Sequence, residues 1–282
     1  MAKVTSPWKS YLVDFLAFGL KEAASCSFAG LFFVTLFLSH KIPLGSFPRY
    51  DFLFLVAVSL QLVLVLTKLE TWDELKAICI FHVLGLALEI FKTHPSIGSW
   101  TYPEPGYLKV MGVPLYSGFM YAAVASYMIQ AWRFFKLKVD HYPNRFLALS
   151  VAIGIYLNFF THHFWYDLRL PLIFLTFLIF RSTDVSFTPY KRRYRMPLLL
   201  SFILIGFFIW LAENIATFYG AWKYPNQLGA WSKVHIGKWN SWSLLAIMTF
   251  VIVTNLKHIK NTISHSSLRK YFIMDDQADF VT

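Results

Sequence analysis

The sequence has little charge. Only 15% of its 282 residues are Asp, Glu, Lys or Arg, whereas a soluble domain usually has about 25%. Hydrophobic residues make up 57% of the chain and aromatic residues 19%, and the mean hydropathy is +0.51. This composition excludes an ordinary soluble domain and predicts an all-α, polytopic bundle of membrane helices.

Cysteines are also few, and several common motifs are missing. Cys26 and Cys79 both lie in apolar segments and have no metal-ligand spacing. The chain has no Gly-x-Gly-x-x-Gly, no P-loop and no Gly-x-Ser-x-Gly, so nucleotide binding and serine hydrolysis have no support. We expect no cofactor and no metal.

Basic residues outnumber acidic ones, and the formal net charge is +11. They lie between the apolar segments and not along one helix face with stacking aromatics, which argues against nucleic acid as a partner. The N-terminal segment, the even-numbered connections and the C-terminal tail hold 18 of the 26 Lys and Arg residues, and the odd-numbered connections hold 8. The positive-inside rule therefore predicts a multi-pass protein with both termini in the cytoplasm and the lipid bilayer as its surroundings.

A membrane-spanning helix needs roughly 20 mainly apolar residues, and we predict about eight of them. The segments are 25–39, 50–66, 75–91, 110–134, 145–160, 170–180, 196–218 and 242–256. Seven or nine spans remain open, because the sixth segment is short and the apolar stretch 11–20 before the first is expected at the membrane interface. Together they form one transmembrane domain over residues 1–256, followed by a polar cytoplasmic tail over 257–282.

Two segments of the chain repeat one pattern. An apolar helix carries Glu89, and the turn Trp100-Thr-Tyr102-Pro follows about ten residues later. A second apolar helix carries Glu213, and Trp222-Lys-Tyr224-Pro follows at a similar distance. An even number of spans separates the two helices, so they point the same way. This predicts a tandem duplication of a four-helix unit, with repeats over 11–136 and 145–256.

The two glutamates are the strongest functional signal. An ionised carboxylate in hydrocarbon costs at least a few kcal/mol, so each should face the bundle interior and have a partner. His82, Glu89 and Lys92 lie on one helical stripe, where Lys92 could pair with Glu89 or extend its ammonium group to the surface. A structural ion pair is the alternative to a catalytic role. No lysine follows Glu213, and two carboxylates in different environments suit acid–base catalysis.

A polar cluster follows the fifth span. Asn158, His162, His163, Asp167 and Arg169 occur within twelve residues. We interpret both histidines and Asp167 as catalytic candidates that polarise the substrate or relay protons. Neutral histidines bonded to Asp167 or to a carbonyl are favoured. A metal held by both histidines and a distant carboxylate is the alternative, which the scattering of the other histidines disfavours.

The candidate substrate-binding residues combine aromatic and polar side chains from these segments. They are His82, Lys92, Trp100, Tyr102, Tyr116, Asn158, Arg169, Asn214, Trp222 and Tyr224. Tryptophan and tyrosine are common at any membrane interface, but a duplicated pocket explains why the ordered turn occurs twice. Tyr116, Ser117 and Tyr121 follow Pro114 in the first turns of the fourth span and should lie near Glu89.

Several of these motifs resemble a known family. The runs 81–94, 98–106 and 112–121 are similar to the bacterial membrane family called domain of unknown function 817, and so are 158–163, 195–200 and 208–215. The resemblance spans nearly the whole chain. It implies a bacterial plasma-membrane protein and brings no established activity with it.

A weaker likeness is to carotenoid-modifying membrane enzymes, namely small-subunit-type lycopene cyclases and bisanhydrobacterioruberin hydratases. Those enzymes pair a helical acid with an aromatic turn and then a Gly-Val-Pro segment, and they protonate a polyene without consuming a redox cofactor. The layout around Glu89 and Pro114 is similar, as is that around Glu213. The cyclases have acidic residues after the proline, where this chain has Leu115, Tyr116 and Ser117. The likeness implies an apolar-substrate pocket.

Three functions follow from these residues. The leading hypothesis is an integral membrane enzyme that performs acid–base chemistry on a lipid or isoprenoid, whose cation the aromatic ring faces could stabilise. The first alternative is a proton- or cation-coupled small-solute transporter that uses the same glutamates. The second is a structural or assembly protein in which the polar side chains lock the helices together.

Overall fold

The protein is mostly helical in the computed structural model, which describes residues 7–257. The helices are α1 (Pro7–Ser25), α2 (Ser27–Leu38), α3 (Arg49–Leu66), α4 (Trp72–Thr93), α5 (Ser117–Phe134), α6 (Arg145–Thr161), α7 (Arg169–Phe180), α8 (Leu198–Phe218), the 3-10 turn η1 (Pro225–Gln227) and a last helix, Lys238–Lys257. The predicted helical class is thus confirmed, although short strands accompany the helices. The predicted tail beyond Lys257 lies outside the described residues.

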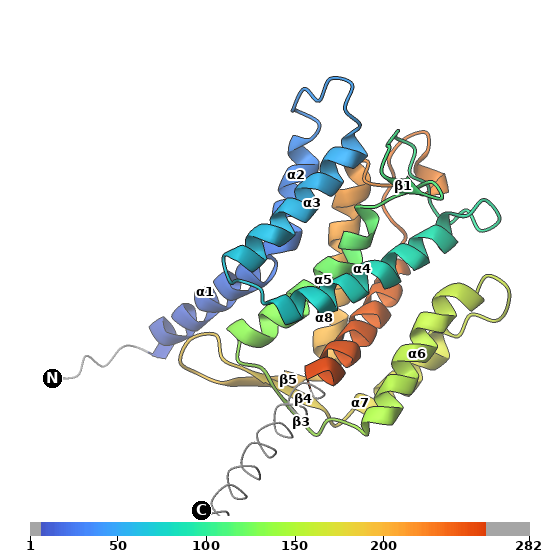
Figure 1. The fold of residues 1–282 in the computed structure, drawn as a ribbon. Helices are drawn as coiled ribbons and strands as arrows, with labels where there is room; N and C mark the ends of the chain where they lie inside the picture. Colours follow the sequence, from blue (N-terminus) through green and yellow to red (C-terminus); the bar gives the residue numbers. More distant parts are fainter. Residues whose placement is uncertain (1–6, 258–282) are drawn as a thin grey trace, which may run out of the picture.

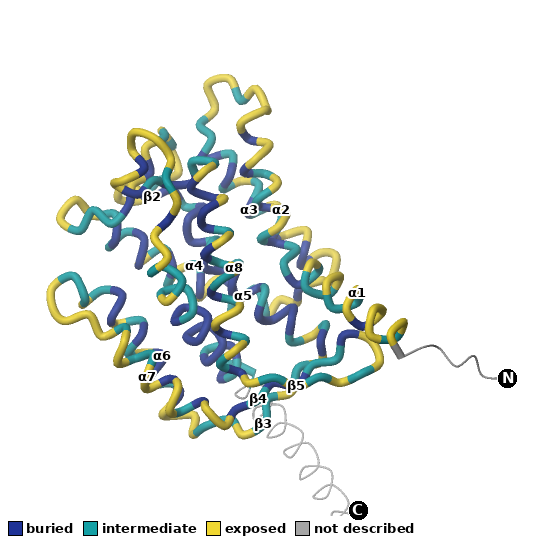
Figure 2. Tube along the Cα trace, turned by 180° about the vertical axis from the view of Figure 1, so that it is seen from behind, coloured by how far each residue is buried: buried dark blue, intermediate teal, exposed yellow. Residues whose placement is uncertain are grey.

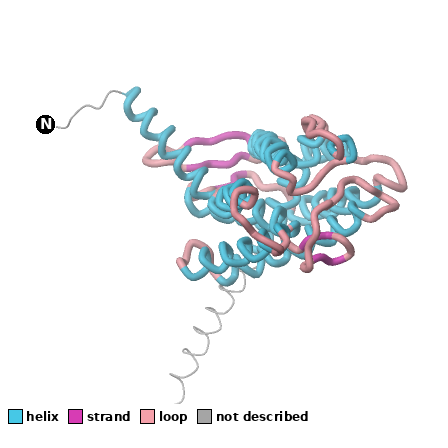
Figure 3. The backbone as a smooth tube through the Cα atoms, turned by 90° about the horizontal axis from the view of Figure 1, so that it is seen from above, coloured by secondary structure: helices cyan, strands magenta, loops and turns pink. Residues whose placement is uncertain are grey.

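The connections between helices alternate between two ends of the bundle (Figure 1). One end, which we call the loop end, carries the connections 39–48, 94–116, 162–168 and 219–237. It includes a short hairpin of β1 (Lys109–Val110) and β2 (Val113–Pro114). The opposite end carries an antiparallel sheet, visible in Figure 3, of β3 (Lys138–Asp140), β4 (Asp184–Phe187) and β5 (Tyr194–Pro197) in the order β3–β4–β5.

Three helices are long and apolar enough to cross a membrane: α3, α8 and Lys238–Lys257. Helices α1 and α2 meet at a bend of 68° and would count as a fourth span if they act together. Helix α7 has 12 residues, or about 18 Å, which is short of the ~30 Å of a bilayer core. Eight spans and the duplication over 11–136 and 145–256 therefore stay predictions.

Large apolar side chains cover the outer surface of the bundle. Leu66 on α3 is 74% exposed, Phe177 on α7 53% and Phe208 on α8 62%. A water-soluble surface rarely carries so many contiguous apolar groups, whereas the hydrocarbon of a bilayer would cover them at no cost. The structure thus supports membrane association.

Three predicted boundaries are wrong. The fourth apolar segment does not begin as a helix at Val110, because Gly112 (φ +84°) turns the chain into the β1–β2 hairpin, which puts Pro114 in β2. The seventh does not begin at Met196, which pairs with Val185 in the sheet. The apolar stretch predicted over 11–20 is part of a longer helix, α1, which ends at Ser25.

The helix Lys238–Lys257 lies in the centre of the bundle, with half of its residues buried. Figure 2 shows the buried residues gathered on the central helices, while α6 and α7 lie at the side. Two glycines allow close contacts between neighbouring helices. Gly85 on α4 faces the ring of Tyr121 on α5, and Gly206 on α8 faces Ser243 on the last helix.

We predict that Gly206→Ala destabilises the fold. An added Cβ would lie 2.2 Å from Ser243 Oγ and 2.7 Å from the Ser243 backbone nitrogen, so rotation of a side chain cannot relieve the clash. Overpacking of this kind costs about 1–3 kcal/mol, which should lower the melting temperature of the purified protein. Gly30→Ala on α2, where nothing lies within 4 Å, is the control. Equal melting temperatures for the two variants would contradict this packing.

Candidate functional site

Glu89 lies near the C-terminal end of α4 and is 2% exposed. Its Oε2 accepts hydrogen bonds from Trp100 Nε1 and Tyr102 OH, both at 2.7 Å, and its Oε1 accepts one from Tyr121 OH at 2.8 Å. Trp100 and Tyr102 come from the turn that follows α4, whereas Tyr121 comes from the second turn of α5. A buried carboxylate needs such donors, and three aromatic side chains supply them.

Glu213 occupies the corresponding place near the end of α8 and is 3% exposed. Its Oε1 accepts a hydrogen bond from Tyr224 OH at 2.6 Å, and its Oε2 accepts one from Trp242 Nε1 at 2.8 Å. Tyr224 belongs to the following Trp-x-Tyr-Pro turn. Trp242 is the fifth residue of the last helix, as Tyr121 is the fifth residue of α5. The two carboxylates therefore have similar surroundings, with three donors for Glu89 and two for Glu213.

The two turns pair with each other. Thr101 and Lys223, the middle residues of the turns, form an isolated antiparallel bridge with N–O distances of 2.9 and 3.0 Å. Trp100 and Tyr224 face each other at 6.0 Å between ring centroids. The spacings differ, because Trp100 follows Glu89 by 11 residues and Trp222 follows Glu213 by nine. Trp100 donates a hydrogen bond to Glu89, whereas the indole donor at Glu213 is Trp242 from the last helix.

Both glutamates line one cavity of about 100 Å³ beneath the paired turns. Eight of the candidate residues border it: Glu89, Lys92, Trp100, His162, Arg169, Glu213, Trp222 and Tyr224. Met120, Phe159 and Leu245 supply apolar walls. The site thus combines acidic, basic and aromatic groups from α4, α5, α6, α7, α8 and the last helix around one partly open cavity.

One interpretation of the sequence paired Lys92 with Glu89. The structure shows no such ion pair between these two described residues. Lys92 is 5% exposed, and its Nζ lies 2.7 Å from His163 Nε2 and 3.3 Å from His162 Nε2. His162 Nδ1 lies 2.7 Å from the carbonyl oxygen of Asn158 and must carry a proton to bond there. In a neutral imidazole, His162 Nε2 is then the acceptor that faces the ammonium group.

The histidine pair is not bonded to Asp167. Helix α6 ends at Thr161, so Asp167 does not continue its face, and its carboxylate instead accepts from Arg169 Nε at 2.7 Å. Hydrogen bonds from Arg169 lower the pKa of Asp167 to about 2. Burial, with the charge of Lys92 next in size, lowers the pKa of His163 to about 4. His163 is therefore neutral at physiological pH.

The other candidate residues lie outside the cavity wall and hold its parts in place. His82 packs edge-to-face against Phe119, with 4.6 Å between the ring centroids. Tyr116 OH donates to the carbonyl oxygen of Ala221. Asn158 Oδ1 accepts from the Leu168 backbone, and Asn214 Oδ1 from the Val234 backbone. These four residues position loops and helices, whereas Tyr102 bonds directly to Glu89.

Sequence reasoning did not select Lys238, Ser241 or Trp242, although all three line the cavity. Lys238 Nζ lies 5.1 Å from the ring centroid of Trp100 and 4.7 Å from that of Tyr224. The sequence places Lys238 at the start of an apolar helix, where a lysine usually marks the membrane flank. The preceding connection also contains Lys223 and Lys233, so the sequence did not distinguish Lys238 from the other flanking lysines.

Within residues 7–257, no group of three or more His, Cys, Asp or Glu side chains could hold a metal ion. His162 and His163 face Lys92, whose positive charge would oppose a cation at their Nε2 atoms. The two described cysteines are free, and Cys79 is exposed on α4. The site contains the groups needed to bind a polar molecule and to move protons.

Comparison with known proteins gives one family. The model described as "Protein of unknown function (DUF817)" matches residues 14–250. The chain is 56% identical over 243 residues to a protein of Bacillus subtilis (strain 168) named "Uncharacterized protein YoaT", which covers 86% of this chain and 91% of that protein. No solved structure matches the chain.

We predict that the folded state loses stability as the pH falls from about 6.5 to about 4. The unfolded chain binds a proton at His163 near pH 6.5, whereas folded His163 binds one only near its pKa of about 4, so protons favour the unfolded state in that interval. The melting temperature should fall over this range. The fall should be shallower in His163→Gln, and an unchanged pH profile in that variant would contradict the prediction.

Proposed function

We propose that this chain, which belongs to the DUF817 family, is an integral membrane enzyme that performs acid–base chemistry on a lipid or isoprenoid. One observation carries the proposal: two buried glutamates with different numbers of hydrogen-bond donors line the same cavity. A purely structural carboxylate has no need of a cavity beside it. Acid–base catalysis needs both groups to reach one substrate.

The two glutamates take different roles. Hydrogen bonds to a carboxylate stabilise its ionised form, and Glu89 accepts three of them. We assign Glu89 to the anionic role, in which its carboxylate would stabilise developing positive charge. Glu213 accepts two and is the group that we assign to exchange a proton with the substrate. The faces of Trp100 and Tyr224 already accept one cation, that of Lys238, and would suit a cationic intermediate as well.

A proton route leads away from the cavity. Lys92 lines the cavity and contacts His162 and His163. His163 is partly exposed at the loop end, so a proton that leaves the substrate can reach solvent through hydrogen-bonding groups. We assign Lys92 and the two histidines to this exchange, with Asp167 and Arg169 as an ion pair beside them.

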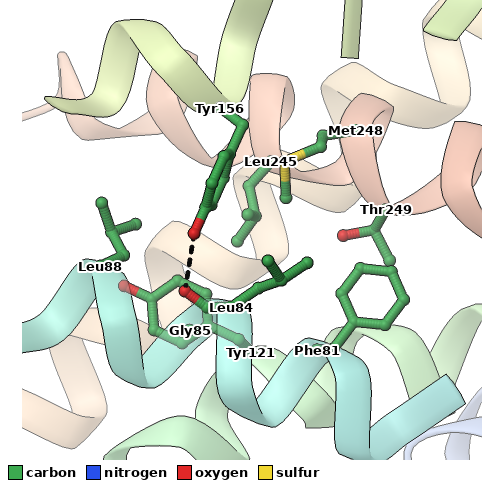
Figure 4. Close-up of a pocket in the computed structure, with 9 residues that line it drawn as sticks. All are labelled: Phe81, Leu84, Gly85, Leu88, Tyr121, Tyr156, Leu245, Met248 and Thr249. Carbon is green, nitrogen blue, oxygen red and sulfur yellow. Dashed lines mark hydrogen bonds between the residues drawn. The ribbon is translucent and has the colours of Figure 1, made fainter. Parts of the chain in front are cut away.

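An apolar crevice supports the choice of substrate class. Figure 4 shows it between α4, α6 and the last helix, lined by Phe81, Leu84 and Met248 among others. Leu88, Tyr121 and Leu245 border both the crevice and the cavity. A substrate with a polar reacting end and a hydrocarbon part would place the first in the cavity and the second along the crevice.

The proposed location is the bacterial plasma membrane, with both termini in the cytoplasm. The sheet end carries Arg192, Arg193 and Arg195, and this excess of positive charge favours the cytoplasmic side. The loop end then lies on the extracytoplasmic side, and the cavity opens near that surface. A multi-pass arrangement would use the spanning helices α3, α8 and Lys238–Lys257.

The test is a comparison of lipid extracts by mass spectrometry. Cells that lack the gene should accumulate a precursor, and the wild-type gene should remove it. Glu89→Gln and Glu213→Gln should leave it in place, because loss of a general acid or base lowers rates by about 10²–10⁴-fold. Glu74→Gln is the matched control, since Glu74 lies on α4 far from the cavity and glutamine can keep its capping box with Thr71.

Membrane levels and melting temperatures of the variants must be measured to separate folding from catalysis. Lipids and pigments that do not change on deletion would contradict an enzyme. In that case, proteoliposomes with a pH-sensitive dye would identify a proton-coupled carrier by a flux that Glu89→Gln abolishes. If the substitutions change nothing except the yield of protein, the polar residues are structural.

A further inference from the structure

We propose that the cavity binds an oxyanion headgroup, a carboxylate or a phosphate, carried by a single hydrocarbon chain. Lys92, Lys238 and Arg169 are the recognition groups. The inference rests on the proposed function and deepens it by naming the chemical class of the substrate. Neither the family description nor the chemistry of the two glutamates requires a negatively charged ligand.

Two lysines at the cavity, Lys92, which is buried, and Lys238, which is half-buried, have no carboxylate partner. Among the described residues, no carboxylate oxygen lies within 4.0 Å of Nζ of Lys92 or Lys238, although six other ion pairs form. Lys92 contacts two imidazole nitrogens, and Lys238 contacts two ring faces. An ammonium group has three N–H donors and is costly to bury without an acceptor of opposite charge.

The cavity glutamates do not meet this need. The oxygen atoms of Glu89 and Glu213 already accept hydrogen bonds from tryptophan and tyrosine donors. An indole N–H can only donate, and Trp100 and Trp242 each donate to one glutamate oxygen. No oxygen of either glutamate lies within 4.0 Å of Nζ of Lys92 or Lys238 among the described residues. These lysine donors therefore make no direct bond to a carboxylate, and an oxyanion ligand in the cavity would supply one.

Arg169 adds a third positive group to the same wall. Its Nε and Nη2 bond to Asp167 at 2.7 and 2.5 Å. Its Nη1 makes one long contact, 3.4 Å to Ser241 Oγ, and both residues line the cavity. A guanidinium with a free edge suits a carboxylate or phosphate oxygen. Because Asp167 already pairs with Arg169, Arg169 contributes its remaining Nη1 donor, and the cations without a bonded carboxylate are those of Lys92 and Lys238.

An apolar crevice continues from the cavity and supports a ligand with a hydrocarbon chain. It is narrow, with about 10 Å³ of space, and leucine, methionine and phenylalanine side chains form most of its wall. Leucine and methionine change rotamer readily, so a single chain could widen it. Thr249 Oγ1 is buried there without a partner within residues 7–257. A free inorganic anion would occupy only the cavity, whereas a charged amphiphile would place its headgroup in the cavity and its hydrocarbon chain in the crevice.

Binding to the purified full-length protein in neutral detergent tests the proposal. The probes are dodecyl phosphate, dodecanoate, dodecanol and inorganic phosphate, with native mass spectrometry or tryptophan fluorescence as the readout. We expect one or both charged amphiphiles to bind, and dodecanol to bind at least about tenfold more weakly, which is the effect of losing one charge-assisted hydrogen bond. Inorganic phosphate should also bind more weakly, because it lacks the chain.

Substitutions of the cavity lysines test whether the anionic headgroup binds at Lys92 and Lys238. Lys238→Met and Lys92→Met should each weaken binding of the charged amphiphile by about tenfold or more, and Lys238→Arg should restore part of it. Lys233→Met is the matched control. Lys233 is exposed on the loop before the last helix, so this substitution removes the same charge outside the cavity. Melting temperatures show which variants are folded, and Lys238→Arg keeps the test valid if a methionine variant is not.

Three results would overturn the inference: no binding of either charged amphiphile, equal binding of dodecanol, or binding that the cavity lysines and Lys233 affect equally. Inorganic phosphate that binds as tightly as dodecyl phosphate would overturn the hydrocarbon part. The experiments distinguish failure of this inference from failure of the proposed function. Amphiphile binding with unchanged cellular lipids would leave an anion site without catalysis, whereas altered lipids without anion binding would leave the enzyme with a neutral substrate.

Discussion

Buried carboxylates must be supplied with hydrogen-bond donors, and this requirement shapes the loop end of the protein. Glu89 and Glu213 each lie near the end of an apolar helix, where water would otherwise solvate them. Aromatic N–H and O–H groups replace that water because they donate hydrogen bonds and still tolerate apolar surroundings. The turns after α4 and α8 must fold back over their own helices to deliver these donors, and the cavity is the space that remains beneath them.

Pairing of the two turns makes one site out of two similar segments. The Thr101–Lys223 bridge holds the turns together, and Arg49 strengthens the loop end by donating to Glu104 at 2.5 Å and to the carbonyl oxygen of Tyr219 at 2.6 Å. Because each glutamate is tied to its own turn, the bridge also fixes the two carboxylates relative to each other. A site with fixed donors is what electrostatic stabilisation of a reacting group requires.

The similarity of the two halves is limited, and the surroundings of the two glutamates differ. Tyr121 and Trp242 occupy the same position on the helices after the turns, yet Glu89 has one donor more than Glu213. Lys92 follows Glu89 by one helical turn, and no lysine follows Glu213. Lys92 turns toward the histidines at the end of α6. The first half therefore contains the lysine that contacts the histidines, and the second half contains the carboxylate with fewer hydrogen-bond donors.

Long apolar runs made the helices predictable, because a backbone in an apolar environment must satisfy its own hydrogen bonds. Eight predicted segments match eight helices, with errors where Gly112 turns the chain and where Met196 joins a sheet. The glutamates and their turns were also predictable, since a charge in such a segment requires a partner. The sequence by itself thus determined where most of the helices form and that Glu89 and Glu213 are buried with hydrogen-bond partners.

The partners of those acids were decided only by tertiary structure. Lys92 was expected at Glu89 on the same stripe of α4, but it contacts histidines about 70 positions later. Lys238 looked like a membrane flank until the fold brought it against rings of both turns. Local spacing describes neighbours within one helix, whereas a cavity is bordered by side chains from several. Which donor meets which acceptor depends on how the helices pack, and that is a property of the whole chain.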